Sequence, residues 1–441
     1  MTQPTVAGRS TPLTILFAPA HTLVDSSQEG SEYYWAYKLI ERLALDYGVR
    51  VIALTVQARV ERPLPGVTFV SVDPGAALPV SNLQRLRFHL RVFAAARRIL
   101  RREQSIDVAH HMLPFGFRGT FNVLALQGRR RRPPVVIGPL QPPLAYNAGD
   151  ELAVSVRDFS ATYTASPSAP PVQMRRAVPS PSAFITTPIL SLLSGETLRR
   201  ADALVAISER AVAAFRTFDP ARRFDVIPVG VDTKVFTPRQ GTSELVVGVG
   251  PTPASGKTPV TVVAVGYLVQ RKAFDVLIEA VASVIGRGHA VRLRLVGDGP
   301  ARGYLEALAR ERGIVESVTF VGRIPHGQIV AEYHAADIFC SSSRSEGFAT
   351  VALEALACGL PIVATPTGGF RELLRQRDVG TLVGFDDVVG MANALARLAA
   401  DPALRAAQGR RGRGLAVEEY DWSVIAGHYV RLYERLAHRR A

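Results

Sequence analysis

Residues 260–285 read VTVVAVGYLVQRKAFDVLIEAVASVI, and this stretch contains the pattern that decides the fold. Its first six residues form a short apolar run rich in β-branched side chains, which predicts a buried strand over residues 260–265. From Phe274 to Ile285 the apolar residues recur at the 3.6-residue period of one helix face. A buried strand that leads into an amphipathic helix is the repeating unit of a parallel sheet covered on both faces.

The same unit recurs along the whole chain. In the first half, predicted strands cover residues 13–18, 49–55, 67–70, 135–137, 203–207 and 224–229. In the second half, they cover residues 260–265, 293–296, 318–321, 338–340, 361–364 and 381–383. We therefore predict an α/β protein of two Rossmann-like, doubly wound domains that face a cleft.

Prolines and glycines interrupt every periodic pattern between the two halves, so residues 238–259 are predicted to be a linker. The N-terminal domain then covers residues 1–237 and the C-terminal domain residues 260–421. The basic helical pattern that ends the chain, residues 422–441, is expected to cross back to the first domain. Residues 146–181 are rich in Ala, Ser and Pro, which is typical of a long loop or lid.

The composition is that of a globular protein, with 47% apolar and 20% charged residues among 441. No apolar run approaches the ~20 residues that span a bilayer, and the first thirty residues lack the pattern of a secretory signal. The two cysteines, Cys340 and Cys358, exclude a disulfide framework and a cysteine-rich zinc site. We therefore expect a soluble, cytoplasmic protein, and the net charge of +14 predicts an anionic partner.

One glycine-rich segment suggests an NTP-hydrolysing P-loop but does not fit it. Residues 250–258 read GPTPASGKT, in which five residues rather than four separate the two glycines. Pro251 and Pro253 also remove amide donors that a phosphate cradle needs. We therefore predict no P-loop here.

The most informative stretch is residues 341–369, SSSRSEGFATVALEALACGLPIVATPTGG. A helix predicted to start near Thr350 would present free amides, which suit a phosphate group. Glu346 precedes this helix start and Glu354 lies in its opening turns, and two carboxylates would repel a bare diphosphate. We therefore expect each glutamate to bind the hydroxyls of a sugar or ribose while a cation holds the phosphates.

That cation is expected in the loop after the strand at residues 260–265. The strand runs into Gly266, and Arg271 and Lys272 precede the next helix. Arginine can hold a diphosphate with two parallel hydrogen bonds, and lysine adds a mobile point charge. The sequence therefore predicts a diphosphate site formed by this loop and the two-glutamate element.

At these residues the chain resembles the family 4 retaining glycosyltransferases, which have the GT-B fold. The resemblance spans roughly residues 201–367 and is carried by Glu346 with Glu354, the Gly266–Arg271–Lys272 loop, and residues 227–238, 295–300 and 354–365. It implies transfer of a sugar from a nucleotide-diphosphate sugar to an acceptor hydroxyl with retained configuration. It also implies that residues 1–237 face the acceptor and residues 260–421 bind the nucleotide sugar.

Roles follow from the resemblance residue by residue. Arg271 and Lys272 would neutralise the leaving diphosphate, Glu346 would bind the transferred sugar, and Glu354 the ribose. The backbone that binds sugar hydroxyls and phosphate would be that of Gly347, Phe348, Ala349 and Thr350. The chain has no Asp-any-Asp motif, so no metal and no separate cofactor is expected.

Two features of the first domain match the family less closely. Gly30 and Ser31 stand where the family has a glycine loop over the phosphates, with Ser31 in place of the usual second glycine. Residues 107–112 read DVAHHM, so His110 aligns with the first of two family histidines and Met112 with the second. Either His110 or His111 could act at the acceptor, or both could be structural.

The segment 83–102 is rich in arginine, with an apolar stripe of Leu83, Leu86, Leu90, Phe93, Ile99 and Leu100. Such a helix could lie on an anionic membrane, at the inner membrane face, or simply pack on the sheet with its arginines in water. A membrane location would suit a lipid-linked or cell-envelope acceptor. Nucleic acid is not expected, because no aromatic platform accompanies the arginines.

Two other functions remain open at this stage. A nucleotide-sugar epimerase could be built on the same two-domain plan, although the Arg-Lys loop and the glutamate pair favour transfer. A non-catalytic nucleotide-sugar-binding protein could also retain the fold. The donor base, the sugar and the acceptor are not indicated by the sequence.

Overall fold

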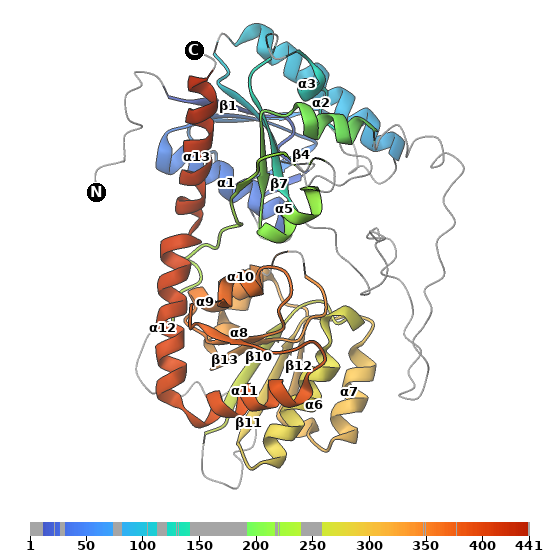
Figure 1. Cartoon of the computed structure of the whole chain (residues 1–441), viewed down its shortest axis with the longest axis vertical. Helices are drawn as coiled ribbons and strands as arrows, with labels where there is room; N and C mark the ends of the chain where they lie inside the picture. Colours follow the sequence, from blue (N-terminus) through green and yellow to red (C-terminus); the bar gives the residue numbers. More distant parts are fainter. Residues whose placement is uncertain are drawn as a thin grey trace. The chain divides into compact units, whose positions relative to one another are not determined.

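The structure is a computed structural model of the chain. It describes residues 12–21, 23–26, 31–73, 82–103, 105–112, 121–128, 130, 132–141, 192–216, 219, 221–239, 258–346, 348, 350–375 and 377–439. These residues form two compact units. Unit 1 contains the described residues up to Gly230 together with those from Trp422 onward, and unit 2 contains those from Val231 to Asp421. Each unit is an α/β domain (Figure 1).

Unit 1 is built on a seven-stranded sheet in the order β5-β3-β1-β6-β7-β8-β9, with every pair parallel. The strands are β1 (Thr14–Phe17), β3 (Arg50–Thr55), β5 (Val67–Ser71), β6 (Val108–His111), β7 (Val135–Leu140), β8 (Ala203–Ala206) and β9 (Asp225–Val226). The helices include α1 (Ser31–Tyr47), α2 (Asn82–Arg102), α3 (Val123–Leu126), α5 (Glu209–Arg216) and α13 (Trp422–His438). A small second sheet pairs β2 (Leu23–Asp25) with β4 (Gln57–Arg59).

The last helix, α13, packs in unit 1 although the chain reaches it from unit 2. Trp422 is buried against Gly230, where a Cβ atom would lie 2.6 Å from the indole ring. The Tyr47 hydroxyl of α1 donates to the Ser423 carbonyl at 2.9 Å, and Arg435 pairs with Asp225 at 2.7 Å. Gly230 is the last residue of unit 1 before unit 2 begins at Val231, so the first residue of α13 packs on the residue where the chain leaves unit 1.

Unit 2 has a parallel six-stranded sheet in the order β12-β11-β10-β13-β14-β15. The strands are β10 (Val260–Val265), β11 (Val291–Val296), β12 (Val318–Gly322), β13 (Ile338–Ser341), β14 (Ile362–Ala364) and β15 (Gly380–Leu382). The helices are α6 (Phe274–Gly286), α7 (Arg302–Glu311), α8 (Ile329–His334), α9 (Thr350–Ala357), α10 (Phe370–Leu374), α11 (Val388–Ala400) and α12 (Pro402–Glu419). Short 3₁₀ turns are η3 (Gln270–Lys272), η4 (Val315–Ser317) and η5 (His326–Gln328).

The central strand β10 explains why this sheet is covered on both faces. Val262 and Ala264 belong to one core cluster, together with α6, α7 and α11. Val263, between them, belongs to a second cluster with residues of α8, α9 and α10. Successive side chains of a strand point to opposite faces, so an unbroken apolar run fills two cores at once. The predicted fold of two Rossmann-like α/β domains is thereby confirmed.

The unit boundary lies a few residues earlier than the sequence suggested. Residues 231–237, placed above with the first domain, pack in unit 2. Phe236 enters the second core cluster, and the Arg413 guanidinium of α12 donates to the carbonyls of Thr233 and Phe236 at 3.0 and 2.7 Å. Pro238 and Gly241 mark where periodicity stops, but the tertiary contacts of the preceding residues decide the domain. The predicted loop 146–181 lies outside the described residues, as does most of the predicted linker.

Candidate active site

The loop after β10 brings the two predicted cations onto the first predicted glutamate. The Lys272 ammonium lies 2.5 Å from Glu346 Oε1, and the Arg271 guanidinium lies 3.4 Å from Oε2 of the same carboxylate. Arg271 also donates to the Ser345 carbonyl at 3.0 Å, and the Ser343 hydroxyl donates to Glu346 Oε1 at 2.7 Å. All three charged side chains are at least 86% buried. The site therefore contains two cations whose charge is partly balanced by one carboxylate.

Glycine at position 266 makes this loop possible. Gly266 has φ +155°, and a Cβ atom there would lie 3.0 Å from Lys272 Cε and 3.1 Å from its ammonium. The Lys272 side chain therefore passes directly over the glycine. The Gly266 amide donates to the Val296 carbonyl at 2.9 Å, which ties the loop to the end of β11. A side chain at this position would occupy the space that Lys272 uses.

The charge of Glu346 is stabilised by its surroundings. Burial alone would raise the pKa of the Glu346 carboxyl. The charges of Lys272 and Arg271 outweigh that effect, and hydrogen bonds from Lys272 and Ser343 add to them, so the pKa lies below its usual value. Glu346 is thus an anion at neutral pH and can accept hydrogen bonds from hydroxyl groups.

The second predicted glutamate, Glu354, lies in α9 and is held by two side chains that the sequence did not point to. His326 Nε2 lies 2.9 Å from Glu354 Oε1, and the Tyr333 hydroxyl donates to Oε2 at 2.8 Å. Burial would lower the pKa of His326, but the hydrogen bond and the charge of Glu354 raise it above the usual value. Phe236 packs edge-on against both rings, at centroid distances of 5.7 and 6.0 Å. The orientation of Glu354 is therefore set by contacts within the protein.

The backbone between the two glutamates is only partly as predicted. Gly347 and Ala349 lie outside the described residues. The Phe348 ring packs on Gly369, where a Cβ atom would lie 3.0 Å from it. Thr350 begins α9, but its amide donates to the Phe348 carbonyl at 3.0 Å, so the free amide predicted at Thr350 is already used within the chain. A helix start often closes such a local turn, which sequence periodicity cannot show.

In unit 1, His110 lies in the core and is held by two hydrogen bonds. The ring is fully buried, Nε2 donates to the Gly138 carbonyl at 3.1 Å, and Nδ1 accepts from the Tyr433 hydroxyl at 2.6 Å. Burial lowers the pKa of His110 to about 3, so it is neutral and both nitrogens are engaged. This arrangement argues against the predicted catalytic role of His110. The sequence could not indicate Tyr433, because it comes from α13, at the other end of the chain.

The other predicted site residues of unit 1 are His111, Ser31 and Gly30. His111 is also fully buried, with Nδ1 accepting from the Asn122 amide at 3.1 Å, and burial lowers its pKa well below the usual value. A catalytic role for His111 stays a prediction. Ser31 is the first residue of α1, and Gly30 lies outside the described residues.

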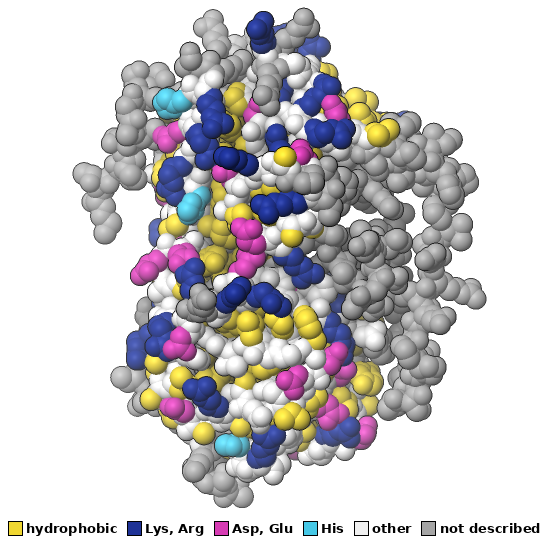
Figure 2. Space-filling view, viewed as in Figure 1, with side chains coloured by type: hydrophobic (Ala, Val, Ile, Leu, Met, Phe, Trp, Pro, Cys, Tyr) yellow, Lys and Arg dark blue, Asp and Glu magenta, His cyan; other side chains and the backbone are white. Residues whose placement is uncertain are grey.

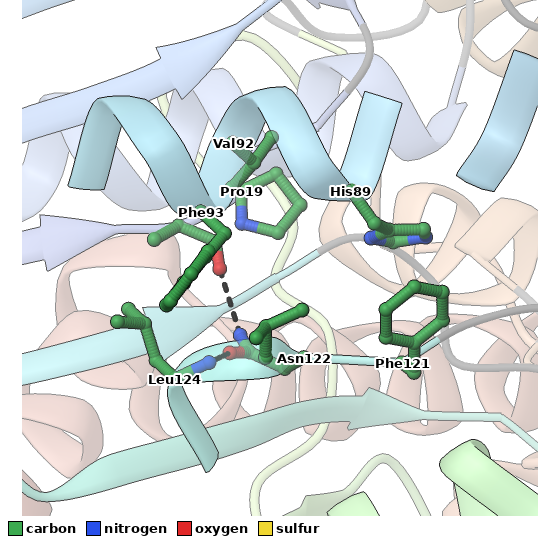
Figure 3. A pocket seen from close by; sticks show the side chains of 9 residues that line it. Pro19, His89, Val92, Phe93, Phe121, Asn122 and Leu124 are labelled. Atoms are coloured by element: carbon green, nitrogen blue, oxygen red, sulfur yellow. Dashed lines mark hydrogen bonds between the residues drawn. The ribbon is translucent and has the colours of Figure 1, made fainter. Parts of the chain in front are cut away.

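A small hollow opens at the carboxyl end of β1, which the sequence analysis did not identify (Figure 3). It is lined by Ala18, Pro19, His89, Val92, Phe93, Phe121, Asn122, Val123 and Leu124. The Asn122 side chain donates to the Ala18 carbonyl at 2.8 Å and accepts from the amide of Leu124 at 2.9 Å. The remaining lining is mainly apolar, and the hollow lies at the strand ends where α/β sheets bind ligands.

Helix α2 has two apolar faces rather than the single stripe predicted. Its buried face consists of Phe88, His89, Val92, Ala95 and Ala96. The predicted stripe coincides with this face only in part: Ile99 follows Ala95 and Ala96 by one turn, whereas Leu90 is 49% exposed and Leu86, Phe93 and Leu100 are half-buried beside it. The side chain of Leu83 is outside the described part. The spacing of apolar residues in the sequence showed that α2 has an apolar face. It did not show which apolar residues of the helix pack on the core.

The basic residues do not form one uniform patch. Arg132, in the second arginine cluster of the sequence, is buried and pairs with Asp202, so it belongs to the core of unit 1. On the face shown in Figure 2, Lys and Arg side chains are spread over both units and stand among acidic ones. Among the described helices, α2 contains the most arginine residues.

No helix in the described part of the chain combines the length and the apolar character that a membrane crossing requires. Among the same residues, no three His, Cys, Asp or Glu side chains gather in a group that could hold a metal ion.

Two family models each match part of the chain. Residues 252–415 match the model of the glycosyl transferases group 1, and residues 29–230 match that of a glycosyl transferase 4-like domain. The GDP-mannose-dependent alpha-(1-6)-phosphatidylinositol monomannoside mannosyltransferase of Mycolicibacterium smegmatis is 33% identical over 54% of this chain and 63% of its own length. The D-inositol 3-phosphate glycosyltransferase of Kribbella flavida is 32% identical over 52% of this chain and 56% of its own. The match thus spans less than two thirds of each relative.

The architecture is also found in solved structures. Sucrose-phosphate synthase from Thermosynechococcus elongatus superposes with a TM-score of 0.63 and 20% identity, over 97% of this chain and 100% of the other. At this identity the likeness concerns the fold alone.

Proposed function

Because residues 252–415 match the glycosyl transferases group 1, residues 29–230 match a glycosyl transferase 4-like domain, and the fold is GT-B, we propose that the chain transfers a sugar from a nucleotide-diphosphate sugar to an acceptor hydroxyl. The observation that carries this proposal is the ion cluster of Arg271, Lys272 and Glu346 at the carboxyl end of β10. A buried pair of cations in this position suits a dianionic leaving group. Both cations are held at this strand end, where they can stabilise the charge that develops on the leaving group.

Each side chain of the cluster has a distinct task in this proposal. Lys272 and Arg271 bind the diphosphate and stabilise the negative charge that grows as it departs. Glu346 orients the transferred sugar by accepting hydrogen bonds from its hydroxyls. Glu354, held by His326 and Tyr333, accepts hydrogen bonds from the ribose. The two cations supply the charge that the leaving group needs, so we propose metal-independent transfer, with retention of configuration as in the family it resembles.

The relatives suggest which substrates to test first. One relative's name specifies GDP-mannose and a phosphatidylinositol mannoside, and the other's specifies D-inositol 3-phosphate. We propose GDP-mannose as the donor and an inositol-containing lipid as the acceptor. A soluble inositol phosphate is the alternative acceptor, and the two can be compared in one assay.

Helix α2 supports a lipid acceptor. It exposes Leu90, with Leu86 and Phe93 half-buried, beside an arginine-rich surface that includes exposed Arg87, Arg91 and Arg98. An apolar stripe beside arginines can enter the headgroup region of an anionic membrane, where each basic residue adds about 1 kcal/mol. We propose that α2 binds the inner face of the membrane peripherally.

The test is direct. Purified protein is incubated with UDP-, GDP- and ADP-sugars, and binding is followed by the rise in melting temperature that a native-state ligand produces. The donor that stabilises most is then supplied with inositol lipids in vesicles or with inositol phosphate, and the products are identified by mass spectrometry. Transfer or slow donor hydrolysis supports the proposal. Epimerised donor without loss of nucleotide, or binding without turnover, would support one of the other two functions instead.

A further inference from the structure

Residues 270–272, here called the cation loop, are held by the segment that follows β13, which donates a hydrogen bond to each of their three carbonyls. The Arg344 side chain donates from Nη1 to the Gln270 carbonyl at 2.8 Å. The Arg344 backbone amide donates to the Arg271 carbonyl at 2.8 Å, and the Ser342 hydroxyl donates to that of Lys272 at 2.9 Å. The backbone of Gln270, Arg271 and Lys272 is thus fastened at every residue to one short segment.

The Arg344 guanidinium is itself fixed by two acids from other parts of unit 2. Its Nε donates to Asp386 Oδ1 at 2.7 Å, and Nη2 lies 3.6 Å from Asp275 Oδ2. Asp386 adopts φ +55°, a left-handed conformation that Asp tolerates better than most residues. The guanidinium therefore joins the cation loop, the first turn of α6 and the loop before α11. Arginine has five donors in a rigid fork, which lysine cannot reproduce.

The cation loop is a single 3₁₀ turn, η3, and it ends at Ala273, which has φ 49° and ψ 40°. The residues before it are anchored separately, because the Leu268 amide donates to the Asp298 carbonyl at 3.0 Å and the Leu268 carbonyl accepts from the Ala301 amide at 2.9 Å. A left-handed alanine is an unfavourable conformation that the surrounding contacts must stabilise. If the contacts from Arg344 are removed, the loop can relax, and the side chains of Arg271 and Lys272 move with it.

From these contacts we infer that Arg344 is a positioning residue of the donor site: it fixes the backbone of the Arg271–Lys272 loop without touching the donor. This inference rests on the proposed function for its catalytic consequence. The alternative is an ordinary surface ion pair, because Arg344 is 34% exposed and such pairs contribute little to stability. A positioning residue and a surface ion pair differ in one respect: only the former should alter the cation loop when the Arg344 side chain is changed.

The experiment compares Arg344→Gln, Arg344→Lys and Ser342→Ala with the wild type. Arg312→Gln is the matched control, because Arg312 is 39% exposed, lies in the same unit, and pairs with Glu279 and Glu311 at 2.7 and 2.8 Å. Amide hydrogen exchange of residues 270–273 is measured first, in protein without ligand. We expect exchange there to quicken about 10-fold or more in Arg344→Gln, less in Arg344→Lys, and not at all in Arg312→Gln.

The second readout is the affinity for GDP and the kinetics of GDP-mannose turnover. A displaced cation loop should weaken GDP binding about 10-fold and lower kcat by a similar or larger factor, with partial rescue in Arg344→Lys. Unchanged exchange in Arg344→Gln, or equal effects in Arg312→Gln, would overturn the inference. If the wild type neither binds GDP nor turns over any donor, the proposed function fails. Faster exchange in Arg344→Gln would still show that Arg344 holds the loop.

Discussion

Lys272 and Glu346 form an ion pair, with 2.5 Å between the ammonium and Oε1, at the place where the donor diphosphate is proposed to bind. Arg271 faces the other oxygen of the same carboxylate at 3.4 Å. The cluster therefore contains its own counter-charge. A diphosphate must share or take over the cations that Glu346 now engages, so Glu346 affects both the affinity for the leaving group and its release.

Changing Glu346 should strengthen GDP binding but slow turnover of the donor. Glu346→Gln keeps the shape but removes the negative charge, so GDP should bind about 10-fold more tightly because the two cations are no longer neutralised. Turnover of the donor should fall at least about 100-fold, because the group that orients the sugar is lost. Calorimetry of GDP binding and single-turnover assays measure the two effects. Weaker GDP binding in this variant would contradict the competition described here.

Lys272→Ala is the complementary change. It removes a cation from both the ion pair and the diphosphate site, so GDP affinity and turnover should both fall, by about 100-fold or more for turnover. Circular dichroism and the melting temperature should show a folded protein. Lys234→Ala, an exposed lysine outside the cluster, serves as the control. Near-normal turnover in both Lys272→Ala and Glu346→Ala would refute the site assignment.

Gly266→Ala should impair activity through Lys272. The added Cβ would lie 3.0 Å from Lys272 Cε, and φ +155° is strained for alanine, so the lysine side chain must move. We expect turnover to fall about 10- to 100-fold. Gly303→Ala, where nothing lies within 4 Å of the new methyl group, should leave turnover unchanged. Equal activity of the two variants would show that the close approach at Gly266 is unimportant.

The His326–Glu354 pair predicts a pH dependence of stability. The pKa of His326 is raised in the folded protein, so the pair's contribution is fully present below the ordinary histidine pKa of about 6.5 and is lost as pH rises through the higher folded value. The melting temperature should therefore decrease as the pH is raised above about 6.5. In His326→Gln the melting temperature should change less with pH in this range. In Tyr333→Phe the melting temperature should be lower at every pH but should change with pH as in the wild type. An identical slope in His326→Gln would assign the dependence to other groups.

His110 offers a test of a structural against a catalytic role. His110→Phe removes two buried hydrogen bonds and leaves the Tyr433 hydroxyl and the Gly138 carbonyl without partners, which should cost about 2–5 kcal/mol of unfolding free energy. Tyr433→Phe should destabilise less, because it removes one bond. Denaturant unfolding gives both values. A His110 variant of unchanged stability whose kcat is lost would instead place this residue in catalysis.

Membrane binding through α2 can be tested by sedimentation with vesicles that contain phosphatidylglycerol. Leu90→Asp should weaken binding about 10-fold or more without loss of stability, because Leu90 is 49% exposed. Leu45→Asp, at a 42% exposed leucine of α1, is the control and should bind as the wild type does. Higher salt should weaken binding of all variants, since the arginines act by charge. Equal binding of both variants would exclude α2 as the contact.

Much of the fold and part of the candidate site could be predicted from local patterns. The alternation of β10 and α6 identified the sheet type because each period depends only on neighbouring residues. The sequence predicted that the Arg271–Lys272 loop and the two-glutamate element form one site, and the structure adds that both cations contact Glu346. The partners of Glu354 could not be predicted, because His326 and Tyr333 reach it from η5 and α8, and no spacing in the sequence encodes that approach.

The sequence by itself determined the two α/β units and the residue types that meet a diphosphate, because strand and helix periods, glycine turns and charge are local properties. Tertiary structure alone decided which groups are already engaged: Tyr433 bonds His110 across 323 residues of chain, and Asp386 holds Arg344 across 42. It also decided which apolar face of α2 is buried. The physical reason is that burial and hydrogen-bond partners depend on contacts between residues that are far apart in the sequence. Such contacts form only when the core folds, so the spacing of residues along the chain does not reveal them.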